Sequence, residues 1–156
     1  MITQIDFKAK EDTLAKFIKS LAHSKFYASK ELLASLIPKV LLKFSLQSQN
    51  DCLRIYVDLL KDKLPIIRKF AAEHLKDLAK CVPPIAENDM IVLIQKISND
   101  DLDLIRVYIV QALLQLTKNI KSKESTLNLL KNLCGDSSWR VRYAVCEALY
   151  DVIFSK

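Results

Sequence analysis

The sequence predicts an all-α fold, arranged as a single solenoid of about four helical hairpins. The 156 residues include one glycine and four prolines, whereas a β-rich fold needs many more turn glycines. Apolar residues make up 51% of the chain, which is enough for a continuous core. A short block also recurs at offsets of 38 and 36 residues, from 62 to 100 and from 100 to 136, and such a period is typical of stacked repeats.

The recurring block begins with an aspartate, reaches an arginine six residues later, and reaches a leucine after seven more. Its three copies are DKLPIIRKFAAEHL (62–75), DDLDLIRVYIVQAL (100–113) and DSSWRVRYAVCEAL (136–149). The aligned residues are Asp62, Asp100 and Asp136, then Arg68, Arg106 and Arg142, then Leu75, Leu113 and Leu149. Each block follows an amphipathic segment, so each unit is expected to form two antiparallel helices.

The expected helices follow from this alternation. The first helix of each unit is expected over 50–61, 88–98 and 123–134, and the second over 65–80, 102–118 and 138–154. A weaker copy precedes them, with helices over 11–22 and 25–44, in which His23 and Ser29 replace the aspartate and the arginine. We therefore expect one array over 1–156, with repeats at 11–44 (degenerate), 48–81, 86–119 and 122–155.

Local signals set the expected helix ends. Pro65 suits the first turn of a helix, where its missing N–H costs nothing. Pro38 is expected to kink or shorten its helix, and Pro83-Pro84 to end the one before it. Gly135 stands where a helix C-terminus commonly adopts a left-handed conformation. The expected N-caps are Asn50 or Asp51, Asn88 or Asp89, and Ser122.

The composition speaks against several classes of protein. No apolar run reaches the length of a membrane span, and the start MITQIDFKAKEDT has no signal-peptide core. The four cysteines form no CxxC pair, so we expect reduced, mostly buried thiols in a cytoplasmic protein, with the nucleus left open as a second location. His23 and His74 have no zinc or catalytic spacing, and one glycine cannot form a phosphate loop. We expect no enzyme, metal or cofactor.

The recurring residues divide into two expected roles. Asp62, Arg68, Asp100, Arg106, Asp136 and Arg142 are expected to form a structural ladder, each arginine pairing with an aspartate of an adjoining turn. The stacked turns are expected to form a partner-binding ridge. Its residues are Lys63, Leu64, Pro65, Ile66 and Lys69, then Asp101, Leu102 and Asp103, then Ser138, Trp139 and Arg140. Trp139 is the strongest candidate anchor, with the alternative that it folds back over Leu133 or Tyr143.

These residues resemble the HEAT repeat, and within it the scaffold (A) subunits of protein phosphatase 2A. LKNLCGDSSWRVRYAVCEAL, LLKDKLPIIRKFAAEHLKDLAK and ISNDDLDLIRVYIVQALLQL are each similar to a repeat of those scaffolds, in the same chain order, and the resemblance extends over about 11–154. It implies a right-handed α-α superhelix and a non-catalytic scaffold that holds a regulatory B-type subunit, joined in the full assembly by the catalytic subunit. Pro65, Arg68, Lys69, Trp139 and Arg140 match its turn positions.

The sequence departs from the family pattern at some positions, and two other functions compete with the scaffold interpretation. The second turn is more apolar than the family pattern, the first unit lacks its arginine, and the chain resembles a fragment of a longer solenoid. One rival function is nucleic-acid binding by a basic inner face, since the net charge is +6. The lysines concerned are Lys69, Lys76, Lys80 and Lys118, but no aromatic residues alternate with them, so nucleic acid is not the expected partner. A transport or adaptor solenoid is the other rival.

Overall fold

The computed structural model describes residues 4–81, 87–119 and 124–154. Within these ranges the chain is helical, with no strand. The elements are α1 (Gln4–Ala22), α2 (Tyr27–Val40), the 3-10 turn η1 (Leu41–Lys43), α3 (Leu46–Leu60), α4 (Pro65–Glu73), α5 (Leu75–Cys81), α6 (Glu87–Ile97), α7 (Asp103–Asn119), α8 (Glu124–Leu133) and α9 (Trp139–Phe154). Pro83, Pro84 and Ser122, which the sequence predicts as a helix stop and an N-cap, lie outside the described residues.

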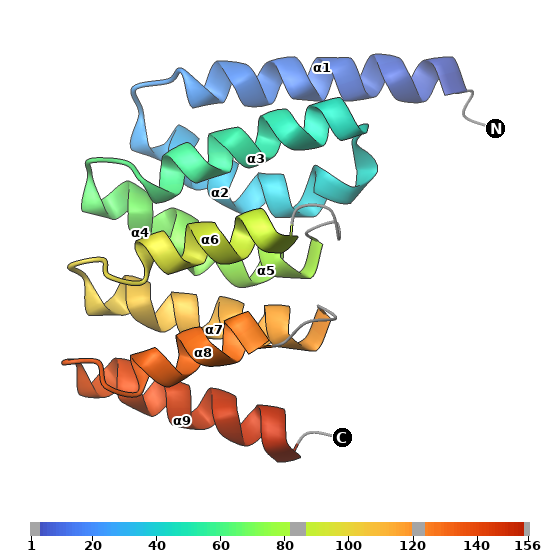
Figure 1. The fold of residues 1–156 in the computed structure, drawn as a ribbon. Coiled ribbons are helices and arrows are strands. Elements are labelled where there is room, and N and C mark those ends of the chain that lie inside the picture. The colour runs from blue at the N-terminus through green and yellow to red at the C-terminus, as the bar shows by residue number, and fades with distance from the viewer. Residues whose placement is uncertain (1–3, 82–86, 120–123, 155–156) are drawn as a thin grey trace.

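The helices form hairpins that stack from the N-terminus to the C-terminus, as Figure 1 shows. The turns inside the hairpins lie along one edge of the stack, at the left of Figure 1, and η1, which links the first hairpin to the second, lies along the other. The second helices of successive hairpins, α5, α7 and α9, pack directly on one another. The predicted all-α solenoid is therefore confirmed.

A continuous core runs through the stack, between and beneath the hairpins. Leu75 and Leu113, two of the recurring leucines, are fully buried, whereas Leu149 is only half-buried because it belongs to the last described helix. Other members of the core are Leu33, Ile37, Tyr56, Leu60, Ile94, Ile105, Ile109 and Leu130. Because each seam between hairpins buries apolar residues from both sides, the hairpins stabilise one another and hold the turns at a fixed spacing.

The helix starts agree with the sequence at Pro65 but not at the predicted N-caps. Pro65 is the first residue of α4. Asn50 and Asp51 lie inside α3, which begins four residues earlier, after Ser45. Ser45 Oγ donates to Glu11 Oε1 across 2.6 Å, and so the start of α3 is fixed by a contact with α1 rather than by a local cap. Asn88 and Asp89 likewise lie inside α6.

The second helix of the second hairpin is interrupted, whereas the sequence predicts it as continuous over 65–80. It ends at Glu73 and resumes at Leu75. The buried Tyr56 hydroxyl of α3 donates a hydrogen bond of 2.8 Å to the carbonyl of Ala71. In a regular helix that carbonyl would accept the N–H of Leu75. A side chain that inserts into the backbone ladder is a known cause of helix kinks, so Tyr56 accounts for the break.

Two further helix ends can be compared with the sequence. Pro38 lies within α2, which ends at Val40 and continues only as η1, so the helix is shortened as predicted. Gly135 does not have the predicted left-handed conformation, since no glycine among the described residues has a positive φ. Its N–H donates to the carbonyl of Asn132 across 3.2 Å, which closes a tight turn that any residue can adopt.

The four cysteines are free thiols, but they are less buried than predicted. Cys52 is buried and Cys81 half-buried, while Cys134 and Cys146 are exposed. Burial raises the pKa of the Cys52 thiol to about 11, which keeps it protonated at neutral pH. Of the two exposed cysteines, Cys134 directly follows α8 and Cys146 lies within α9. None of the described helices is long and apolar enough to cross a membrane.

Candidate functional site

Each of the three C-terminal hairpins contains the same polar turn. Its aspartate accepts a hydrogen bond from the backbone N–H two residues later: Asp62 from Leu64 across 2.9 Å, Asp100 from Leu102 across 3.0 Å, and Asp136 from Ser138 across 2.7 Å. Aspartate favours such turns because its short side chain can bond its own backbone. The conformation of the turn is therefore set locally, by the first residue of the recurring block.

The recurring arginine braces the same turn from inside the following helix. Nη1 of Arg68 donates to the carbonyl of Asp62 across 3.1 Å. Nη1 of Arg106 makes the same bond to Asp100 across 2.6 Å, and Nη1 of Arg142 to Asp136 across 2.8 Å. A guanidinium has five N–H donors in a fixed fork, so the rest of the fork can reach a second partner.

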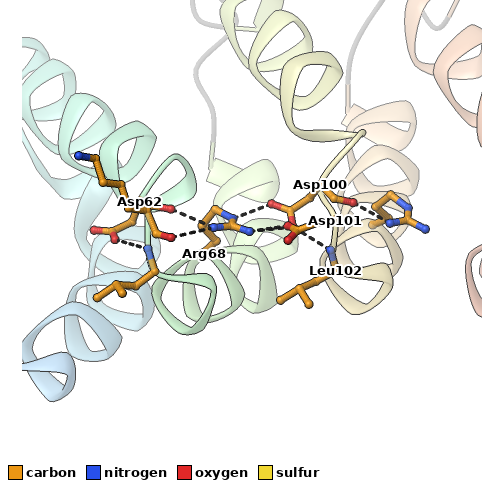
Figure 2. Close-up of polar contacts among 8 residues, drawn as sticks. Asp62, Arg68, Asp100, Asp101 and Leu102 are labelled. Atoms are coloured by element: carbon orange, nitrogen blue, oxygen red, sulfur yellow. Dashed lines mark hydrogen bonds and ion pairs between the residues drawn. The ribbon is translucent and has the colours of Figure 1, made fainter.

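In two of the three hairpins that second partner is the aspartate of the next turn. Arg68 forks onto Asp100, with Nε to Oδ2 at 2.7 Å and Nη2 to Oδ1 at 3.2 Å, and it also reaches Asp101 at 2.7 Å (Figure 2). Arg106 forks onto Asp136, with both bonds at 2.8 Å. Bidentate pairs of this kind fix geometry as well as adding energy. Each arginine thus links its own turn to the following one.

The linked pairs are largely shielded from water. The side chains of Arg106 and Asp136 are 11% and 8% exposed. The hydrogen bond from Arg106 holds the pKa of Asp136 below its ordinary value. Burial works to raise the pKa of Asp100, but the hydrogen bonds from Arg68 and from the Leu102 N–H outweigh it, and that pKa is lowered as well. Both carboxylates are charged at neutral pH and hold the turns together.

The row of pairs does not extend to the first or the last hairpin. The sequence aligns His23 and Ser29 with the aspartate and the arginine, but the structure places Ser24 and Lys30 there, because α2 and α4 begin 38 residues apart. Ser24 Oγ accepts the N–H of Phe26 across 3.2 Å, and Lys30 Nζ donates to the carbonyl of Ala22. Arg142 braces its own turn but forms no ion pair with any residue that the structure describes. The six predicted ladder residues therefore form two complete rungs, Arg68 to Asp100 and Arg106 to Asp136, while Asp62 and Arg142 remain at the two ends.

We use the term turn ridge for residues 62–66, 100–104 and 136–140, which lie along one edge of the stack (Figure 1). Of the predicted contact residues, Lys63, Leu64, Pro65, Ile66, Asp101, Leu102, Trp139 and Arg140 are exposed, and Lys69, Asp103 and Ser138 are half-buried. Every turn presents at least one large apolar side chain to water: Leu64 and Ile66, then Leu102 and Leu104, then Trp139. Apolar residues at fixed spacing on a polar frame can anchor a partner's apolar side chains.

The third turn has an additional set of contacts that the sequence does not reveal. Asp103, at the start of α7, accepts a hydrogen bond of 2.9 Å from Ser138 Oγ and one of 3.3 Å from Arg140 Nη1. The Arg140 guanidinium also lies 5.7 Å from the centre of the Trp139 ring. Trp139 is 65% exposed, so it does not cover the core over Leu133 or Tyr143. Asp103 thus orients the neighbours of an exposed tryptophan.

A polar groove separates the second and third turns. It has a volume of about 560 Å³ and contains Arg106 and Asp136 together with Asn99, Asn132 and Ser137. The side chains of Asn99, Asn132 and Ser137 are exposed and can hydrogen-bond a loop that enters between the turns. The ridge therefore combines apolar projections with a polar groove, which is the usual composition of a protein-binding surface.

The described residues contain no cluster of three histidine, cysteine or acidic side chains that could hold a metal ion. His23 is exposed, and its Nδ1 lies 2.7 Å from the carbonyl of Lys19. His74 is half-buried at the break between α4 and α5, and lies 4.0 Å from Asp77. His23 directly follows α1, and His74 lies between α4 and α5, so the two belong to different hairpins.

Stacked two-helix units with an Asp-led turn and a bracing arginine give the chain an all-α solenoid architecture like that of HEAT-repeat proteins. The HEAT repeat family model matches residues 127–155, which take in most of α8, the third turn and α9. The regulatory A subunit of protein phosphatase PP2A from Saccharomyces cerevisiae is 28% identical over 152 residues, covering 86% of this chain and 24% of the relative. Its counterpart in Schizosaccharomyces pombe is 29% identical over 109 residues, covering 64% of this chain and 18% of the relative.

The sequence-based resemblance is therefore confirmed at the level of homology. The chain spans about a quarter of the length of these relatives or less. Both relatives are named as regulatory subunits of a phosphatase rather than as the phosphatase itself. This agrees with the prediction that the chain is not an enzyme.

Proposed function

We propose that this chain is a non-catalytic scaffold whose turn ridge binds subunits of protein phosphatase 2A. The partner expected on these repeats is a regulatory B-type subunit, with the catalytic subunit joining in the full assembly, in the cytoplasm. The homology to two PP2A regulatory A subunits supports the phosphatase as the system concerned. The observation that carries the proposal is the row of exposed apolar side chains on turns linked by buried ion pairs.

The turns of the ridge are preorganised for binding. A flexible loop loses conformational freedom when it binds, and that loss weakens affinity. Here each turn is fixed by its own aspartate and arginine, and successive turns are joined through Arg68 and Arg106. The partner therefore meets side chains that already stand at a constant spacing. Trp139 is the strongest expected anchor, because tryptophan and arginine dominate binding hot spots and Arg140 lies against its ring.

The lysines of the inner face favour a protein partner over nucleic acid. Lys80 is paired with Asp77 at 2.7 Å, and Lys118 lies 4.0 Å from Asp151. Lys69 is half-buried, and Lys76 is exposed. Phosphate binding needs several cations that are free to replace counterions, and acidic neighbours reduce the number of free lysines.

A transport or adaptor role predicts a different protein cargo on the same turn ridge.

The test is binding of the chain to a purified PP2A B-type regulatory subunit, measured by biolayer interferometry beside thermal melting. Trp139→Ala is expected to weaken binding by about 30-fold, a hot-spot loss of about 2 kcal/mol, with the melting temperature unchanged. Tyr150→Ala is the matched control, because Tyr150 is similarly exposed on the same helix but lies outside the turn ridge. Equal losses in the two variants, or a large melting decrease for Trp139→Ala, would reject the ridge as the docking site.

The same assay separates the rival functions. Binding of a duplex oligonucleotide that falls steeply with added salt would support the nucleic-acid alternative. Capture of a transport cargo, with no affinity for phosphatase subunits, would support the adaptor alternative. The proposed scaffold predicts regulatory-subunit binding that persists at physiological salt, because its anchors are apolar.

A further inference from the structure

The turn between α1 and α2 is built like the turns of the ridge, although it lacks the recurring aspartate. Ser24 Oγ accepts the N–H of the residue two positions later, Phe26, as each recurring aspartate does in its own turn. Lys30 donates to the carbonyl of Ala22 from inside α2, where the later turns use an arginine. A serine and a lysine therefore fix this turn locally. We call residues 24–28 the N-terminal turn.

Phe26 has the same backbone position as Leu64 of the first turn. Each directly precedes its helix, with φ and ψ of −83° and 132° at Phe26 and of −87° and 118° at Leu64. The carbonyl of each accepts the N–H three residues later, that of Ser29 across 3.1 Å and that of Ile67 across 3.0 Å. Backbone geometry sets the direction in which a side chain leaves the chain. Because α2 packs on α4, both side chains start from the same edge of the stack (Figure 1).

The exposure of Phe26 is a property of this turn position and does not depend on its place in the stack. Phe26 is 76% exposed. Leu64 and Leu102 follow it at successive offsets of 38 residues and are 43% and 37% exposed, although described hairpins lie on both sides of their turns. A hairpin stacked before α1 and α2 would therefore leave Phe26 accessible. The three side chains form one apolar row along the edge of the stack.

The N-terminal turn differs from the later turns in its charge. Residues 22–30 contain two lysines, of which Lys25 is exposed, and no aspartate or glutamate. The second turn, 100–104, instead contains three aspartates and no lysine or arginine. Complementary charges select and orient a partner, so the N-terminal turn favours a partner surface that carries a carboxylate. Tyr27 is also exposed and adds an aromatic ring with a polar tip.

We propose that the N-terminal turn is a further docking turn of the scaffold, with Phe26 as its apolar anchor and Lys25 facing a carboxylate of the regulatory subunit. This inference rests on the proposed phosphatase binding, and it extends the docking edge to a hairpin without the Arg–Asp fork. It also specifies the partner surface, which is an apolar hollow for the Phe26 ring bordered by an aspartate or a glutamate. Aromatic rings suit such hollows because each buries a large apolar area.

The test is the affinity of the full 156-residue chain for a purified PP2A B-type regulatory subunit, measured by biolayer interferometry beside thermal melting. Phe26→Ala is expected to weaken binding about 10-fold, as truncation of an interface anchor does. Its melting temperature should equal that of the wild type, because the ring is exposed. Leu42→Ala is the matched control: Leu42 is 64% exposed in η1, at the opposite edge of the same hairpin, and this variant should bind as the wild type does.

Charge reversal tests the carboxylate of the partner. Lys25→Glu should slow association about 5-fold at low salt and less at high salt, because like charges would then face each other. Lys43→Glu changes the net charge equally at an exposed lysine of η1, and its association rate should stay close to that of the wild type. Equal slowing in the two variants would overturn the contact between Lys25 and a carboxylate.

The wild type and Trp139→Ala distinguish failure of this inference from failure of the proposed function. If the wild type binds and Trp139→Ala weakens binding while Phe26→Ala does not, docking excludes the N-terminal turn, and only this inference is wrong. If the wild type does not bind the regulatory subunit, both are wrong. A lowered melting temperature in Phe26→Ala would give the ring a structural role and would also overturn its assignment as an anchor.

Discussion

The first hairpin and the three that follow it have the same architecture but are joined differently. The later seams contain buried forks, such as Arg106 on Asp136. The first seam contains solvent-exposed contacts: Lys19 lies 2.7 Å from Asp51 with 55% of its side chain exposed, and Glu11 accepts hydrogen bonds from Ser45. Exposed ion pairs contribute little because water screens them. The later seams therefore differ from the first in their buried forks, while the hairpin architecture is common to both.

Removing a buried fork should have the largest effect. Arg106→Gln leaves Asp136 buried without its cation and removes the brace on the second turn. We expect a loss of about 3 kcal/mol in unfolding free energy, the cost of breaking a buried pair by removing one partner. That corresponds to a decrease of about 6–12 °C in melting temperature for a chain of this size. Arg54→Gln, at an exposed arginine of α3, is the control and should have almost no effect.

Acid should weaken the later seams through the same carboxylates. The folded pKa values of Asp100 and Asp136 lie below the ordinary value of 3.8. The stability from these groups is therefore fully present above pH 3.8 and is lost as the pH falls below it, towards the folded values. We expect the melting temperature of the wild type to fall more steeply below pH 3.8 than that of Arg106→Gln. Parallel profiles would show that Arg106 does not set the pKa of Asp136.

Adding an arginine to the first hairpin should stabilise the first seam, which lacks the Arg–Asp fork of the later seams. Lys30→Arg places a guanidinium at the position that reaches the next aspartate in later units, here Asp62, because Lys30 stands 38 residues before Arg68, as α2 begins 38 residues before α4. A gain of about 1 kcal/mol in unfolding free energy is expected from a new charge-assisted hydrogen bond. Urea unfolding measures it. No gain should appear in an Asp62→Asn background, and an equal gain there would show that the arginine stabilises the protein in another way.

The smallest effect is expected at the exposed pair of the first seam. Lys19→Ala removes the contact with Asp51 and should cost no more than about 0.5 kcal/mol, as for other surface pairs. Lys16→Ala, at an exposed lysine of the same helix, is the matched control. A cost for Lys19→Ala as large as that of Arg106→Gln would remove the distinction between the two kinds of seam.

Much of this architecture follows from sequence periodicity. The 38- and 36-residue offsets align Asp62, Asp100 and Asp136, and the turns that they start are the turns observed. A repeat enforces the same local solution in each unit, so three weak local signals support one another. The exposed position of Trp139 follows in the same way, from its place in a turn rather than in the buried part of a helix.

The features that sequence alone does not predict depend on contacts between units. The break after Glu73 results from a hydroxyl on another helix, Tyr56, fifteen residues away from the carbonyl that it binds. The start of α3 is fixed by Glu11, which is distant in sequence. The bond from Ser138 to Asp103 joins two turns whose residues are not aligned by the repeat. Helix propensity and capping patterns describe single segments and do not include such contacts.

Hydrogen–deuterium exchange of the chain with and without a purified PP2A B-type regulatory subunit tests the docking surface most directly. If the turn ridge is the binding edge, new protection will be concentrated in peptides containing 62–66, 100–104 and 136–140, and it will be lost at the third turn in Trp139→Ala. Protection confined to the outward faces of α3, α6 and α8, with the three turns exchanging as in the free chain, would contradict a docking role for the ridge.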